Sequence, residues 1–194
     1  MSLAPVDYDY GKETNYIFAT TVTCANEKTR KMFVEAYGHY LNYNHEQAIA
    51  CFSACTELDP NCAMAWWGIA YCVSSNYNWA PGLGSGYDAI QQALKVMDHC
   101  SELEQDLIRA LSTRHTAEAR DAADPSVLNM GNSPELNVAF ANAMAPLYEK
   151  YSGNLAVTAL YVESLMNLKA WQLWDKNTAT GEITPADENT LLLV

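Results

Sequence analysis

The sequence has few basic residues. Only 11 of its 194 residues are Lys or Arg, against 23 Asp or Glu, which gives a formal net charge of -12 at pH 7. Apart from Lys28, Arg30 and Lys31, the bases are scattered along the chain. A chain with this charge is repelled on average by the phosphates of a nucleic acid. We therefore expect no nucleic-acid partner.

Long apolar runs are also missing. The longest are broken by Asn, Glu or Gly well short of the about 20 residues that cross a bilayer. The first residues, MSLAPVDYDYGKET, contain neither the basic nor the apolar region of a signal peptide. The six cysteines are too few for a disulfide-stapled scaffold, which favours a reducing compartment. We expect a soluble, cytoplasmic protein without a membrane partner.

The usual catalytic and cofactor motifs are absent. The sequence has no Gly-x-Ser-x-Gly, no P-loop, no Cys-x2-Cys and no His-x3-His. The glycine-rich stretch 82–86 lacks the lysine and the preceding strand of a phosphate loop, so we interpret it as a connector. We expect no catalytic residue, no metal and no cofactor, and the sequence leaves open whether the protein is an enzyme.

Three cysteines lie close together in the sequence and allow two interpretations. Cys51 and Cys55 are spaced i, i+4, and Cys62 follows shortly after. They could gather a soft metal or form a redox pair. They could also fill small apolar positions of a core, and we favour this second interpretation.

Helical periodicity organises the chain, and alternation typical of strands is nearly absent. Ser101 and Glu104 have the spacing of a capping box, and Asn44 is a predicted helix N-cap. Helices are predicted at 26–44, 44–58, 62–74, 87–97, 101–118, 133–153 and 154–168, and from Thr184-Pro185 to the end of the sequence. Loops are predicted at 76–86, 119–133 and 170–183. The predicted fold is all-α, with seven or eight helices in antiparallel pairs.

Two adjacent segments share a 34-residue register, since Ala36 lies 34 residues before Ala70. Further residues fit the pattern of a repeated helical pair: Ala48, Phe52 and Pro60 in one unit, and Trp66, Ile69 and Ala70 in the next. The pattern resembles the tetratricopeptide repeat (TPR). That resemblance implies a right-handed superhelix. Glu35 and Val73 depart from the repeat, and so does the loop before Tyr87.

A wider resemblance covers most of the chain. The runs NHEQAIACFSACTELDPNCAMAWWGIAYCVSSNYNW, SELEQDLIRALSTRH and LYVESLMNLKAWQLWD look like segments of a family of longer, uncharacterised TPR-containing proteins. The resemblance implies the N-terminal part of a larger solenoid and brings no established catalytic residues. We expect an extended or disordered arm at 1–22 and a TPR-like domain at 23–194. Its clearest repeat is 26–60, the next is 61–99, and 101–194 is degenerate.

Aromatic and amide residues gather around the first predicted loop, and a tryptophan pair flanks the third. Trp66 occupies the core tryptophan position of the repeat, so we expect it to pack in the core and not to bind a ligand. The candidate binding residues are Trp67, Tyr71, Asn76, Tyr77, Asn78, Trp79, Trp171 and Trp174. Long loops with exposed aromatic residues are typical of binding surfaces.

The expected function is non-catalytic recognition of a protein or peptide through a concave groove. The acidic charge favours a basic or amphipathic partner. An alternative is a small-ligand-binding protein or part of an enzyme, with a pocket formed by the 74–86 loop and Trp171/Trp174. A third is a homodimer formed through the C-terminal helix, because the apolar residues 191–194 would otherwise meet water.

Overall fold

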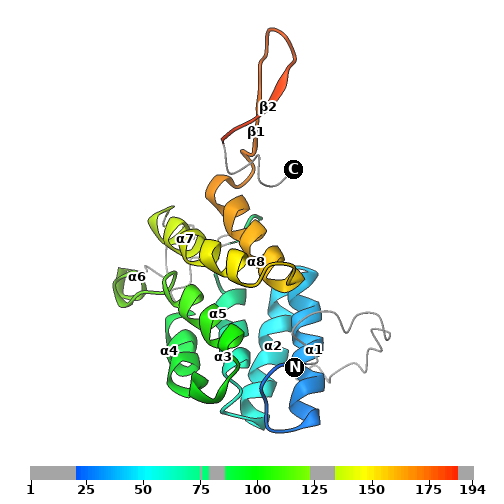
Figure 1. Cartoon of the computed structure of the whole chain (residues 1–194), viewed down its shortest axis with the longest axis vertical. Helices are drawn as coiled ribbons and strands as arrows, with labels where there is room; N and C mark the ends of the chain where they lie inside the picture. The colour runs from blue at the N-terminus through cyan, green and yellow to red at the C-terminus, as the bar shows by residue number, and fades with distance from the viewer. Residues whose placement is uncertain (1–20, 75, 79–85, 123–133, 188–194) are drawn as a thin grey trace.

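The helical period of the sequence gives a mainly helical structure, so the all-α prediction is confirmed at that level (Figure 1). The computed structural model describes residues 21–74, 76–78, 86–122 and 134–187. Within these ranges the α-helices are α1 (Glu27–Leu41), α2 (His45–Leu58), α3 (Ala63–Cys72), α4 (Gly86–Val96), α5 (Glu102–Ser112), α6 (Ala117–Ala122), α7 (Pro134–Lys150) and α8 (Leu155–Met166). Short 3-10 helices, η1 (Met97–His99) and η2 (Asn167–Lys169), follow α4 and α8.

Local capping residues set where several helices begin. The Asn26 side chain accepts a hydrogen bond from the Thr29 N–H and caps α1. Ser101 and Glu104 form the predicted capping box at the start of α5. Asn44 stands at the N-cap position of α2, as predicted, but its side chain makes no capping hydrogen bond. It lies instead 3.4 Å from the His39 ring.

The first five helices form a layer of antiparallel pairs. α1 packs against α2, α3 against both α2 and α4, and α5 against α4. The odd-numbered helices also contact each other, α1 with α3 and α3 with α5. Figure 1 shows these helices standing side by side, with α7 and α8 lying across their ends. α7 packs on α5 and α8 packs on α7.

Aromatic side chains fill the core between the first three helices. Phe33 of α1 meets Phe52 of α2 edge to face, with ring centroids 5.4 Å apart. Gly68 of α3 lets the Phe52 ring approach its backbone, because a Cβ at this position would lie only 2.6 Å from ring carbons. Trp67 is the largest side chain in this core and is 1% exposed. The close packing of α2 against α3 therefore requires a glycine, which has no side chain, at position 68.

The described part of the N-terminal segment is fixed to the helical layer. Val22 is buried, and the Thr23 backbone N–H and hydroxyl both donate to the Glu104 carboxylate at 2.7 and 2.6 Å. The Ala25 N–H donates to Asp59 Oδ2 at 2.6 Å. Residues 1–20, which make up most of the predicted arm, lie outside the described residues.

The predicted helix 101–118 is divided in the structure. α5 ends at Ser112, and at this end the hydroxyls of Ser112 and Thr113 donate to carbonyls of the preceding turn, at 2.7 Å each. A new short helix, α6, then begins under a cap from Thr116, whose Oγ1 accepts from the Ala119 N–H. Helix therefore covers 119–122, which the sequence had assigned to a loop.

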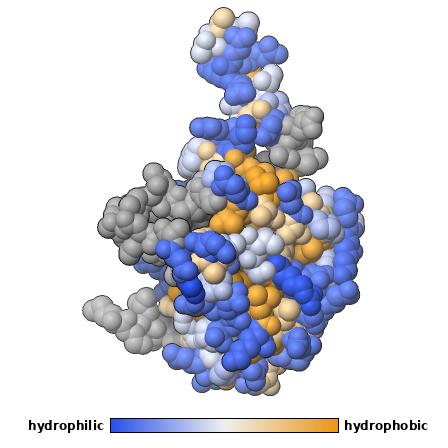
Figure 2. Space-filling view, turned by 90° about the vertical axis from the view of Figure 1, so that its left-hand side faces the viewer, coloured by the Kyte–Doolittle hydropathy of each residue, from blue (hydrophilic) through white to orange (hydrophobic). Residues whose placement is uncertain are grey.

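The third predicted loop is a β-hairpin, and the prediction of a helix starting at Thr184-Pro185 was wrong. Strands β1 (Trp174–Lys176) and β2 (Ile183–Pro185) pair antiparallel, with Trp174 opposite Pro185. The turn is stabilised by Asn177, whose Oδ1 accepts two backbone N–H groups, and by Gly181 at φ 75. Figure 2 shows the hairpin standing above the helical body, with apolar residues gathered near its base.

Two further predictions concern membrane association and self-association. No helix in the described ranges is long and apolar enough to cross a membrane. The apolar residues 191–194, on which the predicted homodimer depends, lie outside the described residues.

Candidate functional site

A single carboxylate joins three helices at the ends of α1 and α3. Glu163 of α8 accepts hydrogen bonds at Oε2 from the Tyr40 hydroxyl and, at 3.1 Å, from the Tyr71 hydroxyl. Tyr40 lies in the last turn of α1 and Tyr71 in the last turn of α3, and both rings are buried. The rings meet edge to face with centroids 5.0 Å apart. The carboxylate is thus held by two buried donors from separate helices.

Both tyrosines stay protonated in this environment. Burial raises the pKa of Tyr40 and of Tyr71 well above the usual value, and the charge of Glu163 raises it further. A protonated hydroxyl must donate to a carboxylate that has only acceptor atoms when ionised. The pair therefore orients Glu163 over the whole physiological pH range.

His45, the first residue of α2, lies beside the tyrosines. Its ring centroid is 6.2 Å from that of Tyr40 and 5.6 Å from that of the exposed Tyr43. His45 is 9% exposed, its Nε2 lies 3.2 Å from Asn76 Nδ2, and its Nδ1 has no hydrogen-bond partner among the described residues. Burial lowers the pKa of His45, so the imidazole is neutral at pH 7. We call Tyr40, Tyr43, His45, Tyr71, Asn76 and Glu163 the Glu163 cluster.

An aromatic pair, a half-buried tyrosine and an exposed tryptophan, lies next to this cluster. The ring of Tyr77, which follows Asn76, contacts the ring of Trp171 with centroids 5.2 Å apart. Trp171 follows η2 and is 72% exposed. Its φ of 63 is in the left-handed region, which is uncommon for a residue other than glycine. The contact brings the first predicted loop together with the start of the third.

A buried cation lies behind the tyrosines. Arg114 follows the end of α5 and donates to Asn137 Oδ1 at 2.7 Å, and its guanidinium lies 5.6 Å from the Phe140 ring centroid. Burial lowers the pKa of Arg114, an effect that the nearby Tyr71 and Glu163 oppose. Within the described part of the chain, no Lys, Arg or His forms an ion pair with Glu163.

Five of the eight predicted site residues lie in three different settings. Tyr71 and Asn76 belong to the Glu163 cluster, and Tyr77 and Trp171 form the adjacent pair. Trp67 instead packs in the core against Tyr71, with ring centroids 5.0 Å apart. Its burial gives it a packing role.

The remaining predicted site residues are Asn78, Trp174 and Trp79. Asn78 is exposed, and its backbone N–H donates to Asn76 Oδ1 at 2.9 Å. Trp174 lies in β1 and is exposed. Trp79 lies outside the described residues. Trp66, explained by packing at the level of sequence, lies at the edge of the core and donates from Nε1 to the Pro60 carbonyl at 2.9 Å.

Sequence reasoning missed Glu163, Tyr40, Tyr43 and His45. One local signal was present, because Glu163 is the only charged residue in the apolar helix α8. A lone acid among apolar residues on a helix needs polar partners when it packs against neighbours. Which partners it finds depends on how α8 crosses α1 and α3.

A buried serine and a half-buried histidine meet just after α3. His115 Nε2 is 2.8 Å from Ser74 Oγ, and the Ser74 hydroxyl donates to the Ala70 carbonyl at 2.9 Å. Since the serine proton is directed at that carbonyl, His115 Nε2 is the donor toward Ser74. This polarity is opposite to that of a serine activated by a general base. The pair is therefore a packing element.

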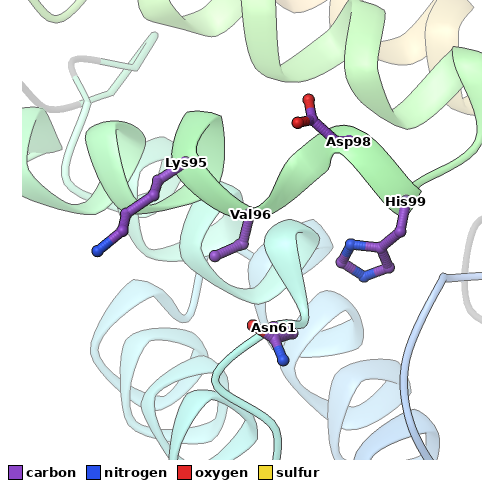
Figure 3. A pocket seen from close by; sticks show the side chains of 5 residues that line it. All are labelled: Asn61, Lys95, Val96, Asp98 and His99. Atoms are coloured by element: carbon purple, nitrogen blue, oxygen red, sulfur yellow. The ribbon is translucent and has the colours of Figure 1, made fainter.

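A surface pocket between the α2–α3 turn and the end of α4 lacks converging polar groups. It is lined by Asn61, Lys95, Val96, Asp98 and His99. Figure 3 shows Asp98 pointing away from Asn61 and Lys95 extending to the opposite end from His99. A ligand site needs several polar groups aimed at one point. This pocket does not provide them.

The six cysteines are free thiols, and none is joined in a disulfide within the described structure. Burial raises the pKa of Cys62 to about 12 and that of Cys100 to about 11. Thiols with such values are poor nucleophiles at neutral pH. The cysteines thus carry no candidate catalytic role.

Comparison with known proteins returns no relative. No protein-family model matches the chain, and neither a curated protein nor a solved structure does so. The candidate function is therefore argued from the geometry of the chain itself.

Proposed function

We propose that this chain is a TPR-type binding module that recognises a basic segment of a partner protein. The recognition surface is the Glu163 cluster together with the Tyr77–Trp171 pair. The observation that carries the proposal is the Glu163 carboxylate, which accepts hydrogen bonds from two buried tyrosine hydroxyls and, among the described residues, forms no ion pair with a Lys, Arg or His.

The helix packing supports the repeat architecture. In stacked helical pairs, the first helix of each pair contacts the first helix of the next, so that one face of the array is built from alternate helices. The contacts of α1 with α3 and of α3 with α5 follow this arrangement. Tyr40 and Tyr71 occupy the last turns of two such alternate helices. The position of the two tyrosines on alternate helices supports placing the proposed surface on that face.

The chemistry of the surface favours a Lys or Arg side chain. A carboxylate that already accepts two hydrogen bonds on Oε2 retains acceptor capacity for a charge-assisted bond. Aromatic faces attract cations, which adds about 0.5–2 kcal/mol for each well-placed ring. Tyr43 and Trp171 present such rings in exposed positions. The net charge of -12 would also speed the approach of a basic partner.

A small organic cation is the second candidate ligand, and one contact favours it. The rings of Tyr77 and Trp171 meet at 5.2 Å and so bring together two of the segments from which the alternative pocket was predicted. A ligand with one ammonium group would use the same carboxylate and rings as a peptide lysine. The two candidate ligands differ in length: a peptide extends beyond its basic side chain, whereas a small organic cation does not.

The test is a selection of binders from a displayed random peptide library against the purified chain. We expect enrichment of Lys or Arg at one anchor position in the selected peptides. Synthetic versions should bind with an affinity that falls as salt increases. Glu163→Gln should weaken binding at least about tenfold, which is the loss of one charge-assisted contact of about 1.4 kcal/mol.

Matched variants make the outcome specific. Glu57→Gln removes the same charge from an exposed position on α2, and we expect it to leave peptide affinity unchanged. Trp171→Ala should weaken binding, while the circular dichroism of all variants stays the same. Peptides without basic enrichment, or peptides that bind Glu163→Gln as tightly as the native chain, would contradict the proposal. Complete competition by a simple alkylammonium ion would favour the small-ligand candidate.

A further inference from the structure

Three potential metal ligands from two helices converge between α1 and α2. Glu35 and His39 are spaced i, i+4 on α1, and Cys51 lies on the facing side of α2. One ligand atom from each, a carboxylate oxygen, an imidazole nitrogen and the thiol sulfur, all lie within 4.8 Å of one another. Among the described residues, this is the one group of three or more such side chains that gathers so closely.

We propose that Glu35, His39 and Cys51 bind a zinc-like divalent ion that connects the first two helices. Sulfur, imidazole nitrogen and carboxylate oxygen are the three ligand types of protein zinc sites. A set with one of each suits zinc or cobalt(II) better than magnesium or calcium, which prefer oxygen alone. Three protein ligands leave a fourth tetrahedral position for water. This inference is independent of the proposed peptide binding.

Only small side-chain movements would close the site. Zinc bonds of about 2.0–2.3 Å in a tetrahedron separate the ligand atoms by roughly 3.3–3.8 Å. His39 Nε2 and Glu35 Oε1 are already 4.0 Å apart. Their side chains are 18% and 13% exposed, so an ion can reach them from solvent. Rotation of the Glu35 and His39 side chains on a fixed helix brings the atoms together.

Neighbouring polar groups are placed to orient the ligands. Asn44 Nδ2 lies 3.4 Å from His39 Nδ1, the ring nitrogen that faces away from Glu35. Gln47 Nε2 lies 3.6 Å from the Cys51 sulfur and donates to it. A metal on His39 Nε2 requires a proton on Nδ1, which the Asn44 carboxamide accepts once its oxygen faces the ring. Metal sites commonly have such supporting partners around the ligands.

Proton release accompanies binding at this site. Burial raises the pKa of Cys51, and the Glu35 charge adds to the effect, while the Gln47 hydrogen bond opposes it. The thiol is therefore protonated without metal, and coordination must replace its proton with the ion.

The grouping also revises the cysteine pattern of the sequence. The sequence grouped Cys51 with Cys55 and Cys62 as possible ligands of a soft metal. In the structure, the two potential ligands that gather with Cys51 come from α1. Cys55 is fully buried, and its thiol lies 3.8 Å from the Thr29 carbonyl. Cys55 is thus a matched control, because it lies one turn from Cys51 on the same helix.

The experiment is a titration of the reduced, metal-free chain with cobalt(II), followed by absorbance. We expect a thiolate-to-cobalt charge-transfer band and the intense visible bands of tetrahedral cobalt, saturating at about one equivalent. One equivalent of zinc should abolish both. Cys51→Ala should remove the charge-transfer band, and Cys55→Ala should retain it. Asn44→Ala should weaken cobalt binding by about 10–100-fold.

His39→Gln is the second decisive variant, because this half-buried position tolerates a polar side chain if Cys51→Ala fails to fold. It should weaken cobalt binding strongly, while His99→Gln at an exposed histidine should not. The proposal is overturned if the native chain gives no thiolate band. It is also overturned if folded Cys51→Ala keeps the band, or if His39→Gln binds cobalt as tightly as His99→Gln.

Discussion

The Tyr71 hydroxyl donates a 3.1 Å hydrogen bond to Glu163 Oε2 and so joins α3 to α8 across 92 residues of sequence. The Tyr40 hydroxyl donates to the same oxygen from α1. Both bonds join a buried tyrosine to a charged acceptor, and hydrogen bonds to charged groups are stronger than those between neutral groups. The two tyrosines therefore fix the position of α8 over the first helices and, with it, the position of the candidate binding surface.

Tyr71→Phe should destabilise the protein by about 1.5–3 kcal/mol, the range for a hydrogen bond to a charged group. The phenyl ring keeps the aromatic packing against Tyr40, so the loss reports the hydroxyl alone. Urea unfolding measures the change. Tyr161→Phe is the control, because Tyr161 is half-buried and its ring stacks on Tyr148. Equal stability losses in the two variants would contradict the role given to Glu163.

Glu104→Ala should cost about 3 kcal/mol or more, because it removes a buried carboxylate that accepts four hydrogen bonds at once. The Glu104 carboxylate is 3% exposed and accepts from Thr23 N and Oγ1 and from Ser101 N and Oγ, at 2.6–2.9 Å. Urea unfolding again provides the measurement. Glu57→Ala, at an exposed site on α2, should change stability by less than about 0.5 kcal/mol. A similar change in both would show that Glu104 is dispensable.

Local signals in the sequence predicted the helices well. The capping box at Ser101 and Glu104 lies where the spacing placed it, and the Asn26 cap opens α1. These signals act within four residues, so they can be read without knowledge of the fold. The hairpin was not predicted, because strands of three residues are too short to show the alternation of apolar and polar residues that indicates a strand. Thr184-Pro185 then looked like a helix start, although Pro185 lies in β2.

The candidate site was only partly predictable. The residues around the first loop were found because aromatic and amide side chains cluster there in sequence. Glu163 was not, because its partner Tyr40 lies 123 residues away and their contact depends on how α8 crosses α1. Adjacent helix positions point about 100° apart, so only one of Trp66 and Trp67 can face the centre of the core. In the structure, Trp67 is the one that faces the centre of the core.

Gly68→Ala should destabilise the protein by about 1–3 kcal/mol, because the new Cβ would lie 2.6 Å from the Phe52 ring. Overpacking of this kind is relieved by a smaller partner. We therefore expect the double variant Gly68→Ala with Phe52→Leu to lose less stability than the two single losses added together. Thermal or urea unfolding of all four proteins completes the cycle. Strict additivity would contradict the close approach of α2 and α3.

Trp171→Gly should leave stability within about 1 kcal/mol of the native value, because two effects oppose each other. The left-handed φ of 63 costs a tryptophan about 1–2 kcal/mol that glycine avoids, while the ring contact with Tyr77 is lost. Peptide affinity should nevertheless fall as in Trp171→Ala. Unfolding and peptide binding measured on the same sample separate the two effects. A large loss of stability would assign Trp171 to packing rather than binding.

Stability should decrease as the pH falls from 7 to 5, and His115 should account for much of the change. Burial, together with the charge of Arg114, lowers the pKa of His115 from 6.5 to about 4. Between these two values the unfolded chain binds a proton that the folded chain does not, so acid favours unfolding. The stabilisation is complete above pH 6.5 and is lost as the pH approaches 4. At pH 5 the expected loss is about 2 kcal/mol.

The variant His115→Gln tests this assignment, because glutamine can still donate to Ser74 but does not titrate. Urea unfolding at pH 7 and pH 5 should show a smaller loss in this variant than in the native chain. Burial also lowers the pKa of His45, so part of the pH dependence should remain. His99→Gln, at an exposed histidine, should behave like the native chain. If His115→Gln loses as much stability as the native chain, the His115 imidazole is not the group that responds to acid.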